Sequence, residues 1–259
     1  SLLEKTYIGF KRSGALLNKT DKDKLKEINK RLSSLTLQFS QNHLKETNNF
    51  YLHITDKTQL DGLPELQISQ AKQAAEEKGV EGWAITLHAP SYVPFMMYAK
   101  NRELRQKLYM AYNTQCTHDN EYNNYTIVKE IVNLRHDMAK LLGYNNYSDY
   151  VLERRMAEKP ENIYKMIDEL IANYKEPAQK ELQALEELAK EQEGSDFTLM
   201  PWDISYFSQH LKKKMFDIDQ EMLRPYFKLE NVKKGVFGLA NRMYGITLKK
   251  SKDIHVYNP

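Results

Sequence analysis

The stretch DKDKLKEINKRLSSLTLQFSQNHLKET, residues 21–47, decides the fold class of this chain. Its apolar side chains recur at alternating steps of three and four residues: Leu25, Ile28, Leu32, Leu35 and Phe39. This spacing lines one face of an α-helix and leaves the other faces to charged and polar side chains. Thr20 is expected to cap the helix, because its hydroxyl can accept a hydrogen bond from a free N–H of the first turn. The pattern predicts a long amphipathic helix over residues 21–47.

Helical periodicity continues through most of the 259 residues, which include only 10 glycines and 8 prolines. Further helices are expected at residues 66–78, from Ser91 through residue 112 with Ser91 as a cap, and at 127–141, 149–155, 160–192, 203–214 and 230–244. The helix over 127–141 has a predicted apolar stripe: Ile127, Ile131, Leu134, Met138 and Leu141. Glycines at positions 79, 143 and 245 are placed to end three of them. Pro177 is expected to kink or divide the helix over 160–192, because proline removes a backbone hydrogen bond. The sequence predicts a mainly α protein.

Two short segments read as strands. Phe50, Leu52 and Ile54 alternate with more polar neighbours, which is the period of two typical of a half-buried strand. GWAITL, residues 82–87, is a second candidate. The two segments can pair, so one or two short β-strand pairs are expected within the helical fold.

Composition excludes several classes of partner. Lysine and arginine number 38 and aspartate and glutamate 35, a balance that favours no nucleic-acid partner. No run of 18 apolar residues occurs, so no membrane partner is expected. Cys116 is the one cysteine, which excludes an internal disulfide and suits the cytoplasm, with a bacterial periplasm left open.

Sequence-local catalytic motifs are absent. The seven histidines never come closer than ten residues, so no H-E-x-x-H zinc helix is present, and G-x-S-x-G and phosphate-loop motifs are also missing. Cys116 and His118 are neighbours in a connecting segment, a spacing that rarely makes a nucleophile and its base. We therefore expect no catalytic residue and no metal ligand in this chain, and its substrate-binding residues are unknown from sequence.

Structural roles are predicted for several polar and aromatic residues. Arg102 and Arg105 lie one helical turn apart and can brace neighbouring helices through forked hydrogen bonds to carboxylates. Asp203 is expected to cap a helix while Trp202 anchors the loop before it. Three tyrosines are expected to pack with their hydroxyls at polar edges: Tyr92, Tyr98 and Tyr109.

Several stretches, in this order, carry a family resemblance: EKTYIGFKRSGALL at 4–17, DKTQLDGLPE at 56–65, APSYVPFMMYAKNRELRQKLYMAY at 89–112, KLLGYNNYSDYVLERRMAEKPE at 140–161, and the segment 202–246 that opens with WDISYF. Together they resemble the thimet oligopeptidase and dipeptidyl carboxypeptidase family of zinc metallopeptidases, and the first stretch with Glu46, Thr47 and Asn48 looks like its dipeptidyl carboxypeptidase branch. The resemblance covers nearly the whole chain.

The resemblance implies a multi-helix lobe of a neurolysin-like metallopeptidase whose zinc motif does not occur here. Residues 1–259 are expected to form a single incomplete helical region: 1–60 a long helix and strand, 61–200 a helical lobe, and 201–259 a segment leading toward the missing catalytic part. The parent enzyme is expected to bind one zinc ion and to hydrolyse short peptides, releasing C-terminal dipeptides if it follows that branch.

The isolated segment is expected to bind no zinc, to be inactive, and to self-associate through exposed apolar faces. Its tail after Gly245 reads as extended and ends without a stop signal, which favours a part of a longer protein. The alternative is a non-catalytic helical scaffold or binding module.

Overall fold

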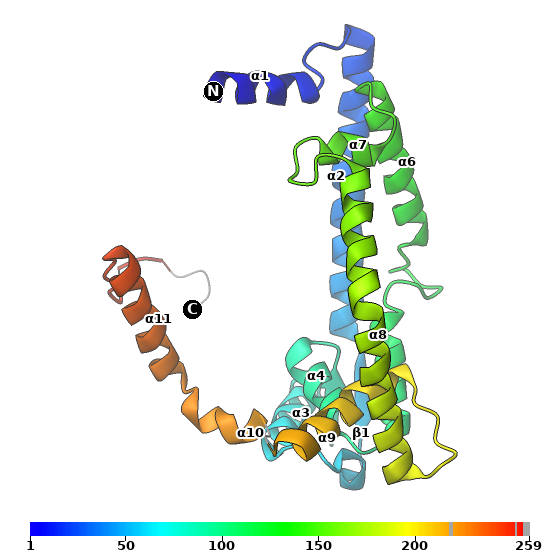
Figure 1. Ribbon diagram of the computed structural model, residues 1–259, viewed down its shortest axis with the longest axis vertical. Helices are drawn as coiled ribbons and strands as arrows, with labels where there is room; N and C mark the ends of the chain where they lie inside the picture. Colours follow the sequence, from blue (N-terminus) through cyan, green and yellow to red (C-terminus); the bar gives the residue numbers. More distant parts are fainter. Residues whose placement is uncertain (218–219, 252, 256–259) are drawn as a thin grey trace. The chain divides into compact units, whose positions relative to one another are not determined.

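The computed structural model describes residues 1–217, 220–251 and 253–255. Helices dominate it, and the only sheet in the described residues has two strands, which confirms the predicted mainly α class (Figure 1). The contacts divide the chain into two compact units, Ser1–Gln209 and His210–Pro259. No helix of the described residues is both long enough and apolar enough to cross a membrane.

The first unit is built along α2, Lys19–Asn49, which confirms the long helix predicted at 21–47. Its cap is Asn18 and not Thr20, because the Asn18 side chain accepts a hydrogen bond from the Asp21 N–H at 2.9 Å. Thr20 already lies within the first turn. With 31 residues, the helix is roughly 46 Å long.

α6, Tyr125–Leu141, lies beside α2 in Figure 1 and packs against it. Leu35 is buried against Ile127 and Ile131, which are members of the apolar stripe predicted for this region. Farther along the pair, Asn42 donates a buried hydrogen bond to Asn124 at 3.0 Å. The facing stripes of the two helices therefore form one core of this unit.

The main core lies around the predicted strand pair. β1, Tyr51–Ile54, and β2, Trp83–Thr86, are antiparallel, with Leu52 opposite Ile85. The 3₁₀ turn Lys57–Leu60 and helix α3, Glu65–Glu77, connect the strands, and α3 packs on β2. The buried apolar side chains of this core are Ile54, Leu60, Leu63, Ala71, Ile85, Leu87, Phe95, Met96, Ala99, Leu104 and Leu108.

The region predicted as one helix from Ser91 to residue 112 is two helices, α4 Ala89–Tyr98 and α5 Arg102–Asn113. α4 begins before Ser91, with Pro90 in its first turn and Pro94 inside it. The helix ends at the extended residue Ala99, and the side chain of Asn101 caps α5 by accepting from the Leu104 N–H. The Asn101 cap explains the interruption, since it starts a new helix with its own satisfied first turn.

The remaining elements of the first unit are α1 Leu2–Arg12, α7 Tyr147–Leu152, α8 Pro160–Glu193 and the 3₁₀ turn Pro201–Asp203. The Arg12 guanidinium donates to the Tyr144 hydroxyl and the Tyr150 carbonyl, which ties α1 to the region of α7. α8 remains one helix through Pro177, so that proline does not divide it.

The helix α9, Ile204–Phe216, begins in the first unit and ends in the second. The second unit also contains α10 Gln220–Leu223, the 3₁₀ turn Arg224–Tyr226 and α11 Leu229–Tyr244. Gly245 ends α11 in the left-handed conformation, as predicted. The described residues 246–251 form neither helix nor strand.

Candidate functional site

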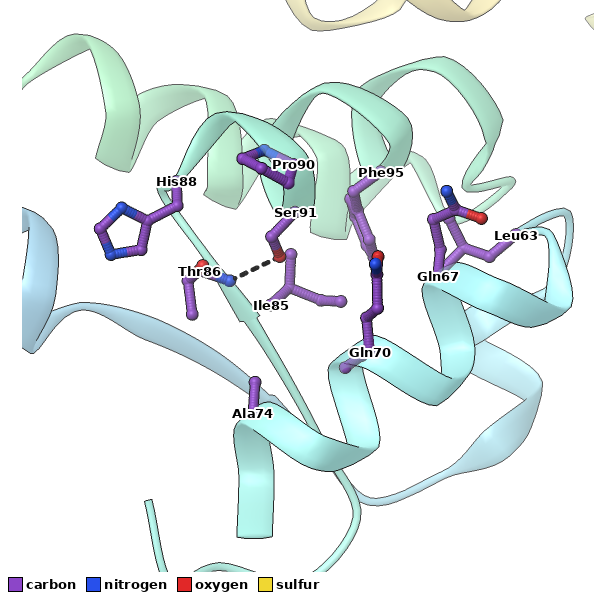
Figure 2. Close-up of a pocket in the computed structure, with 11 residues that line it drawn as sticks. Leu63, Gln67, Gln70, Ala74, Ile85, Thr86, His88, Pro90, Ser91 and Phe95 are labelled. Carbon is purple, nitrogen blue, oxygen red and sulfur yellow. Dashed lines mark hydrogen bonds between the residues drawn. The ribbon is translucent and has the colours of Figure 1, made fainter. Parts of the chain in front are cut away.

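A cavity of about 160 Å³ opens between α3, the end of β2 and the start of α4 (Figure 2). Its walls combine apolar and uncharged polar side chains: Leu63, Gln67, Gln70, Ala71, Ala74, Ile85, Thr86, His88, Pro90, Ser91 and Phe95. Ile85 and Phe95 are almost fully buried and belong to the main core, so the floor of the cavity is rigid and apolar.

Ser91 holds the two sides of this cavity together. Its hydroxyl oxygen accepts a hydrogen bond from the Thr86 N–H at 3.0 Å, which Figure 2 marks with a dashed line. The predicted role of Ser91 as a helix cap is therefore wrong, because the helix has already begun and the hydroxyl bonds to the preceding strand. The bond fixes the last residue of β2 against the first turn of α4.

Gln67 lines the cavity, and its side chain carries an unsatisfied polar atom that is closed off from solvent. Its Oε1 is buried, and in the described part of the chain it has no hydrogen-bond partner. Ala71 and Ala74, on the same helix, leave space beside it because their side chains are single methyl groups. Sequence reasoning missed this site, since an alanine-rich helix face next to a strand is also the ordinary pattern of close packing.

A second polar cluster joins α5 to the turn before α9. The Arg102 Nη2 donates to Asp203 Oδ2 at 2.8 Å, and the Arg105 Nη2 donates to Asp203 Oδ1 at 2.9 Å. Arg105 also donates to the backbone carbonyls of Ala99 and Lys100. The predicted bracing by forked arginine–carboxylate bonds is confirmed.

Asp203 does not cap α9 as predicted. Its carboxylate accepts from the Met200 N–H at 3.1 Å, so it closes the 3₁₀ turn Pro201–Asp203 instead. Both arginine planes also lie over aromatic rings, Arg102 at 4.3 Å from the Phe197 ring and Arg105 at 4.2 Å from the Tyr206 ring. Stacking and paired hydrogen bonds hold α5 against the turn before α9, so the role of this cluster is structural.

The aromatic residues singled out in the sequence pack on the main core. Trp202 meets Tyr109 edge to face at 6.3 Å, and Tyr92 stacks on Tyr112 at 4.2 Å. Burial, together with the neighbouring tyrosines, raises the pKa of Tyr92 to about 12. Tyr92 therefore stays neutral at physiological pH, which supports the predicted packing role.

Cys116 and His118 do not form a nucleophile and base. Cys116 is buried, and burial, followed by the hydrogen bond and the charge of Glu46, raises the pKa of its thiol to about 11. His118 places its Nε2 3.8 Å from Glu46 Oε1 and 3.3 Å from the Thr114 hydroxyl. A protonated, buried thiol is a poor nucleophile.

No three His, Cys, Asp or Glu side chains of the described residues come together in a way that could hold a metal ion. The donors present there do not fit a zinc site.

The profile of peptidase family M3 matches residues 95–259. Oligopeptidase A of Escherichia coli strain K12 is 38% identical over 254 residues, which cover 96% of this chain and 37% of that protein. Probable cytosolic oligopeptidase A of Arabidopsis thaliana is 37% identical over 242 residues, or 90% of this chain and 34% of that protein.

Dipeptidyl carboxypeptidase of Escherichia coli strain K12 is 32% identical over 260 residues, covering 100% of this chain and 38% of that protein. The chain therefore spans less than two fifths of the length of each of these relatives. Its identity to the oligopeptidases exceeds its identity to this dipeptidyl carboxypeptidase, although the sequence motifs near the start favour the latter branch.

Proposed function

Because the chain belongs to peptidase family M3, we propose that it forms a helical lobe of a zinc-dependent oligopeptidase that hydrolyses short peptides. One observation carries this proposal: 96% of the chain aligns with oligopeptidase A at 38% identity. The aligned part therefore includes the core as well as the segment after Trp202. A lobe shared over its whole length is expected to keep the role that it has in the relative.

Zinc, one ion per complete enzyme, would lower the pKa of a water molecule and supply the hydroxide that attacks the peptide. We assign no step of that reaction to the residues of this chain, because their donors do not fit the ion. The lobe would instead form part of the wall that admits short, unfolded peptides. On its own, the chain should bind no zinc and cleave no peptide.

The bracing cluster gives the lobe a physical role within such a wall. Asp203 joins the start of α5 to the turn before α9 through two arginines, so that turn is held against α5 within the first unit. Fixed elements position neighbouring groups more precisely than free loops do. We therefore assign Arg102, Arg105 and Asp203 to positioning and not to substrate contact.

The preferred reaction within this proposal is cleavage by an oligopeptidase, and the removal of C-terminal dipeptides is the alternative that the assay decides. Higher identity to oligopeptidase A favours the first. The name of the Arabidopsis relative includes the word cytosolic, and the single cysteine also suits a reducing compartment, so we place the enzyme in the cytoplasm.

A chimera tests the function directly. The aligned 254-residue part of Escherichia coli oligopeptidase A is replaced by this chain, and hydrolysis of internally quenched peptides of increasing length is followed by fluorescence and mass spectrometry. We expect chelator-sensitive cleavage of short peptides, and the mass spectra separate internal cuts from dipeptide release. A folded chimera without hydrolysis would reject the proposal.

The control for that assay is the 259-residue chain by itself. It should show no peptide cleavage and no stoichiometric zinc by metal analysis. Tight binding of one zinc ion to this chain alone would contradict the assignment of the metal site to other parts of the enzyme.

Self-association of the isolated chain is part of the same proposal. The first half of α8 exposes a row of large apolar side chains: Tyr164, Met166, Ile167, Leu170, Ile171 and Tyr174. An apolar surface of this kind favours association with another apolar surface. Light scattering over a dilution series should show oligomers that dissociate on dilution, and a strict monomer at high concentration would contradict this.

A further inference from the structure

We propose that an exposed apolar row on α11 is a docking surface for a second amphipathic helix with acidic flanks, supplied by the part of the peptidase outside this chain. The source of that partner helix rests on the proposed function. The surface itself rests on the spacing of its apolar side chains, on their exposure and on the charges beside them, all within the second unit.

The apolar side chains of α11 follow a heptad pattern. Along the 16 residues of the helix they recur at steps of three, four, three and four: Leu229, Val232, Val236, Leu239 and Met243. These are the a and d positions by which one helix packs into another. The five side chains are 40–61% exposed, and no residue of α11, all of which the structure describes, is buried. The row is therefore a helix-packing surface without a partner in the second unit.

Positive charge lies on both sides of the apolar row. With Leu229 at position a, Lys233 falls at e and Arg242 at g, next to the row, while Lys234 falls on the opposite face of the helix. Glu230, the one acidic residue in the sequence of α11, lies outside the flanking positions. Charges at e and g select the partner of such a row through ion pairs between the helices. The flanks of the partner are therefore acidic.

Gly235 supports close packing at one flank of the row. It lies at a g position, and a Cβ built there would meet nothing within 4 Å. Glycine weakens the interior of a helix, and no contact of the described residues requires it here. The space beside it lets a partner helix approach the backbone of α11.

The extent of the relatives identifies the source of the partner helix. The family M3 match includes α11, and Escherichia coli oligopeptidase A aligns with 96% of this chain while the chain covers only 37% of that protein. More than three fifths of the relative can therefore supply a helix that covers the row. A second copy of α11 fits less well, because it brings the same lysine and arginine and no acidic side chain at its flanks.

Fluorescence anisotropy of a labelled peptide tests the docking surface on the 259-residue chain. The peptide has three heptads, with leucine at a and d and glutamate at e and g, and the matched control peptide has lysine at e and g. We expect saturable binding of the glutamate peptide, roughly tenfold tighter than that of the lysine peptide. The difference should shrink between about 50 and about 500 mM NaCl, because salt screens exposed charges.

Substitutions in α11 separate this surface from nonspecific attraction. Leu239→Glu places a charge in the apolar row and should weaken binding of the glutamate peptide by roughly tenfold or more. Lys233→Glu should lower the preference for the glutamate peptide roughly threefold, and adding Arg242→Glu should reverse it. Lys234→Glu makes the same charge change on the opposite face and should leave the preference unchanged. Circular dichroism checks that each variant keeps its helical content.

The chimera with Escherichia coli oligopeptidase A tests where the partner comes from. When the rest of the enzyme is present, its own helix should cover the row. The glutamate peptide should therefore bind the chimera roughly tenfold or more weakly than it binds the isolated chain. Undiminished binding to a folded, active chimera would overturn this source of the partner.

Three results with the isolated chain would overturn the docking surface: no saturable binding, equal binding of the two peptides, or equal effects of Lys233→Glu and Lys234→Glu. Oligomers that Leu239→Glu dissociates would mean that a second copy covers α11, and would also overturn the acidic partner. A folded chimera that excludes the peptide but hydrolyses nothing would reject the proposed peptidase function alone and leave the docking surface standing.

Discussion

Arg105 and Asp203 are 98 residues apart in the sequence, yet the Arg105 Nη2 donates to Asp203 Oδ1 at 2.9 Å with both side chains almost fully removed from solvent. Arg102 reaches the other oxygen of the same carboxylate from a position that is 40% exposed. A buried charge of this kind stabilises the fold only while all partners are present, because an unpaired ion in the interior is costly. Loss of Asp203 from this cluster should therefore destabilise the first unit.

Asp203→Ala should reduce the free energy of unfolding by about 3–5 kcal/mol, since it leaves the Arg105 charge buried without its carboxylate. Arg102→Ala should cost less, because that side chain is partly solvated and its loss leaves the inner pair intact. Glu103→Ala is the control: its exposed side chain should change stability by no more than about 0.5 kcal/mol. Urea unfolding measures the free energy of unfolding of all three variants. Equal losses in Asp203→Ala and Glu103→Ala would show that the buried Arg105–Asp203 pair does not stabilise the fold.

Gly62 is required by a close approach of two backbone segments. Its φ is +91°, and a Cβ there would lie 2.2 Å from the Tyr98 carbonyl oxygen. Gly79 also has a positive φ, of +70°, but a Cβ there would meet nothing within 4 Å. Gly79→Ala should therefore cost roughly 1 kcal/mol from backbone strain alone, and Gly62→Ala at least twice that amount.

Urea unfolding of the two alanine variants checks this difference. A Gly62→Ala protein as stable as Gly79→Ala would show that the loop after β1 and the end of α4 can separate without loss. The hydrogen bond from the Lys100 N–H to the Asp61 carbonyl, 2.9 Å long, lies beside the same contact and should exchange its proton faster in Gly62→Ala.

The long helices were predictable because their apolar stripes extend over many turns. Leu25 and Leu35 of α2, and Ile127, Ile131 and Met138 of α6, lie in the predicted rows and are buried. Which helices would pair was not predictable, since a stripe defines a face and not its partner. The strand pair was predicted from local alternation, but its register was not, because the 3₁₀ turn and α3 separate the two strands in the sequence.

The helix caps and the cavity could not be predicted reliably, because they depend on tertiary contacts that local sequence patterns do not reveal. Both Asn18 and Thr20 can cap a helix, and only the backbone geometry decides in favour of Asn18. Ser91 looks like a cap in sequence, but tertiary packing brings its hydroxyl to Thr86. The cavity could not be foreseen, because its walls come from α3, β2 and α4, and the sequence does not show that these elements pack together.

Arg31 and Glu130 link α2 to α6 at the surface through two hydrogen bonds of 2.5 and 2.7 Å. The hydrogen bonds from Arg31, and then its charge, hold the pKa of Glu130 below its ordinary value of 4.5. A carboxylate whose pKa is lower in the folded state stabilises the fold above about pH 4.5, and this contribution is lost as the pH falls through the folded value.

Glu130→Gln should therefore show a flatter decline of stability below pH 4.5 than the unmodified chain, with little difference in that slope near neutral pH. High salt should reduce the gap between the two proteins, because both side chains are partly exposed. Parallel pH profiles of the two proteins below pH 4.5 would show that the pair contributes nothing to acid stability.

Pro177 lies at an exposed position inside α8, where it cannot donate the hydrogen bond that an ordinary residue would make. Pro177→Ala should stabilise the chain by up to about 3 kcal/mol, the difference in helix propensity between the two residues. Pro160→Ala is the matched control in the same helix, because a proline in the first turn loses no helical bond and its replacement should give little or no gain. Thermal unfolding followed by circular dichroism measures both, and a destabilised Pro177→Ala protein would mean that the packing of α8 requires the proline.

Cys116 is 5% exposed, and its backbone N–H donates to Glu46. Burial, with Glu46 as the second cause, raises the pKa of its thiol from 9.0 to about 11. At pH 8 the thiolate fraction is then about one in a thousand, roughly a hundredfold below that of the unfolded thiol. Ellman's reagent should therefore modify the native chain at least a hundredfold more slowly than the same chain in urea at that pH.

The same pKa difference predicts how stability depends on alkaline pH. The protonated thiol is favoured in the folded state, so its contribution is fully present below pH 9 and is lost as the pH rises toward 11. Glu46→Gln removes the smaller, electrostatic part of the shift and should speed modification at pH 8 only modestly, because burial remains. His118→Ala should leave the rate unchanged. If His118→Ala slowed the reaction, or if the native and unfolded chains reacted equally fast, Cys116 would be an activated thiol and its assignment as a buried structural residue would be wrong.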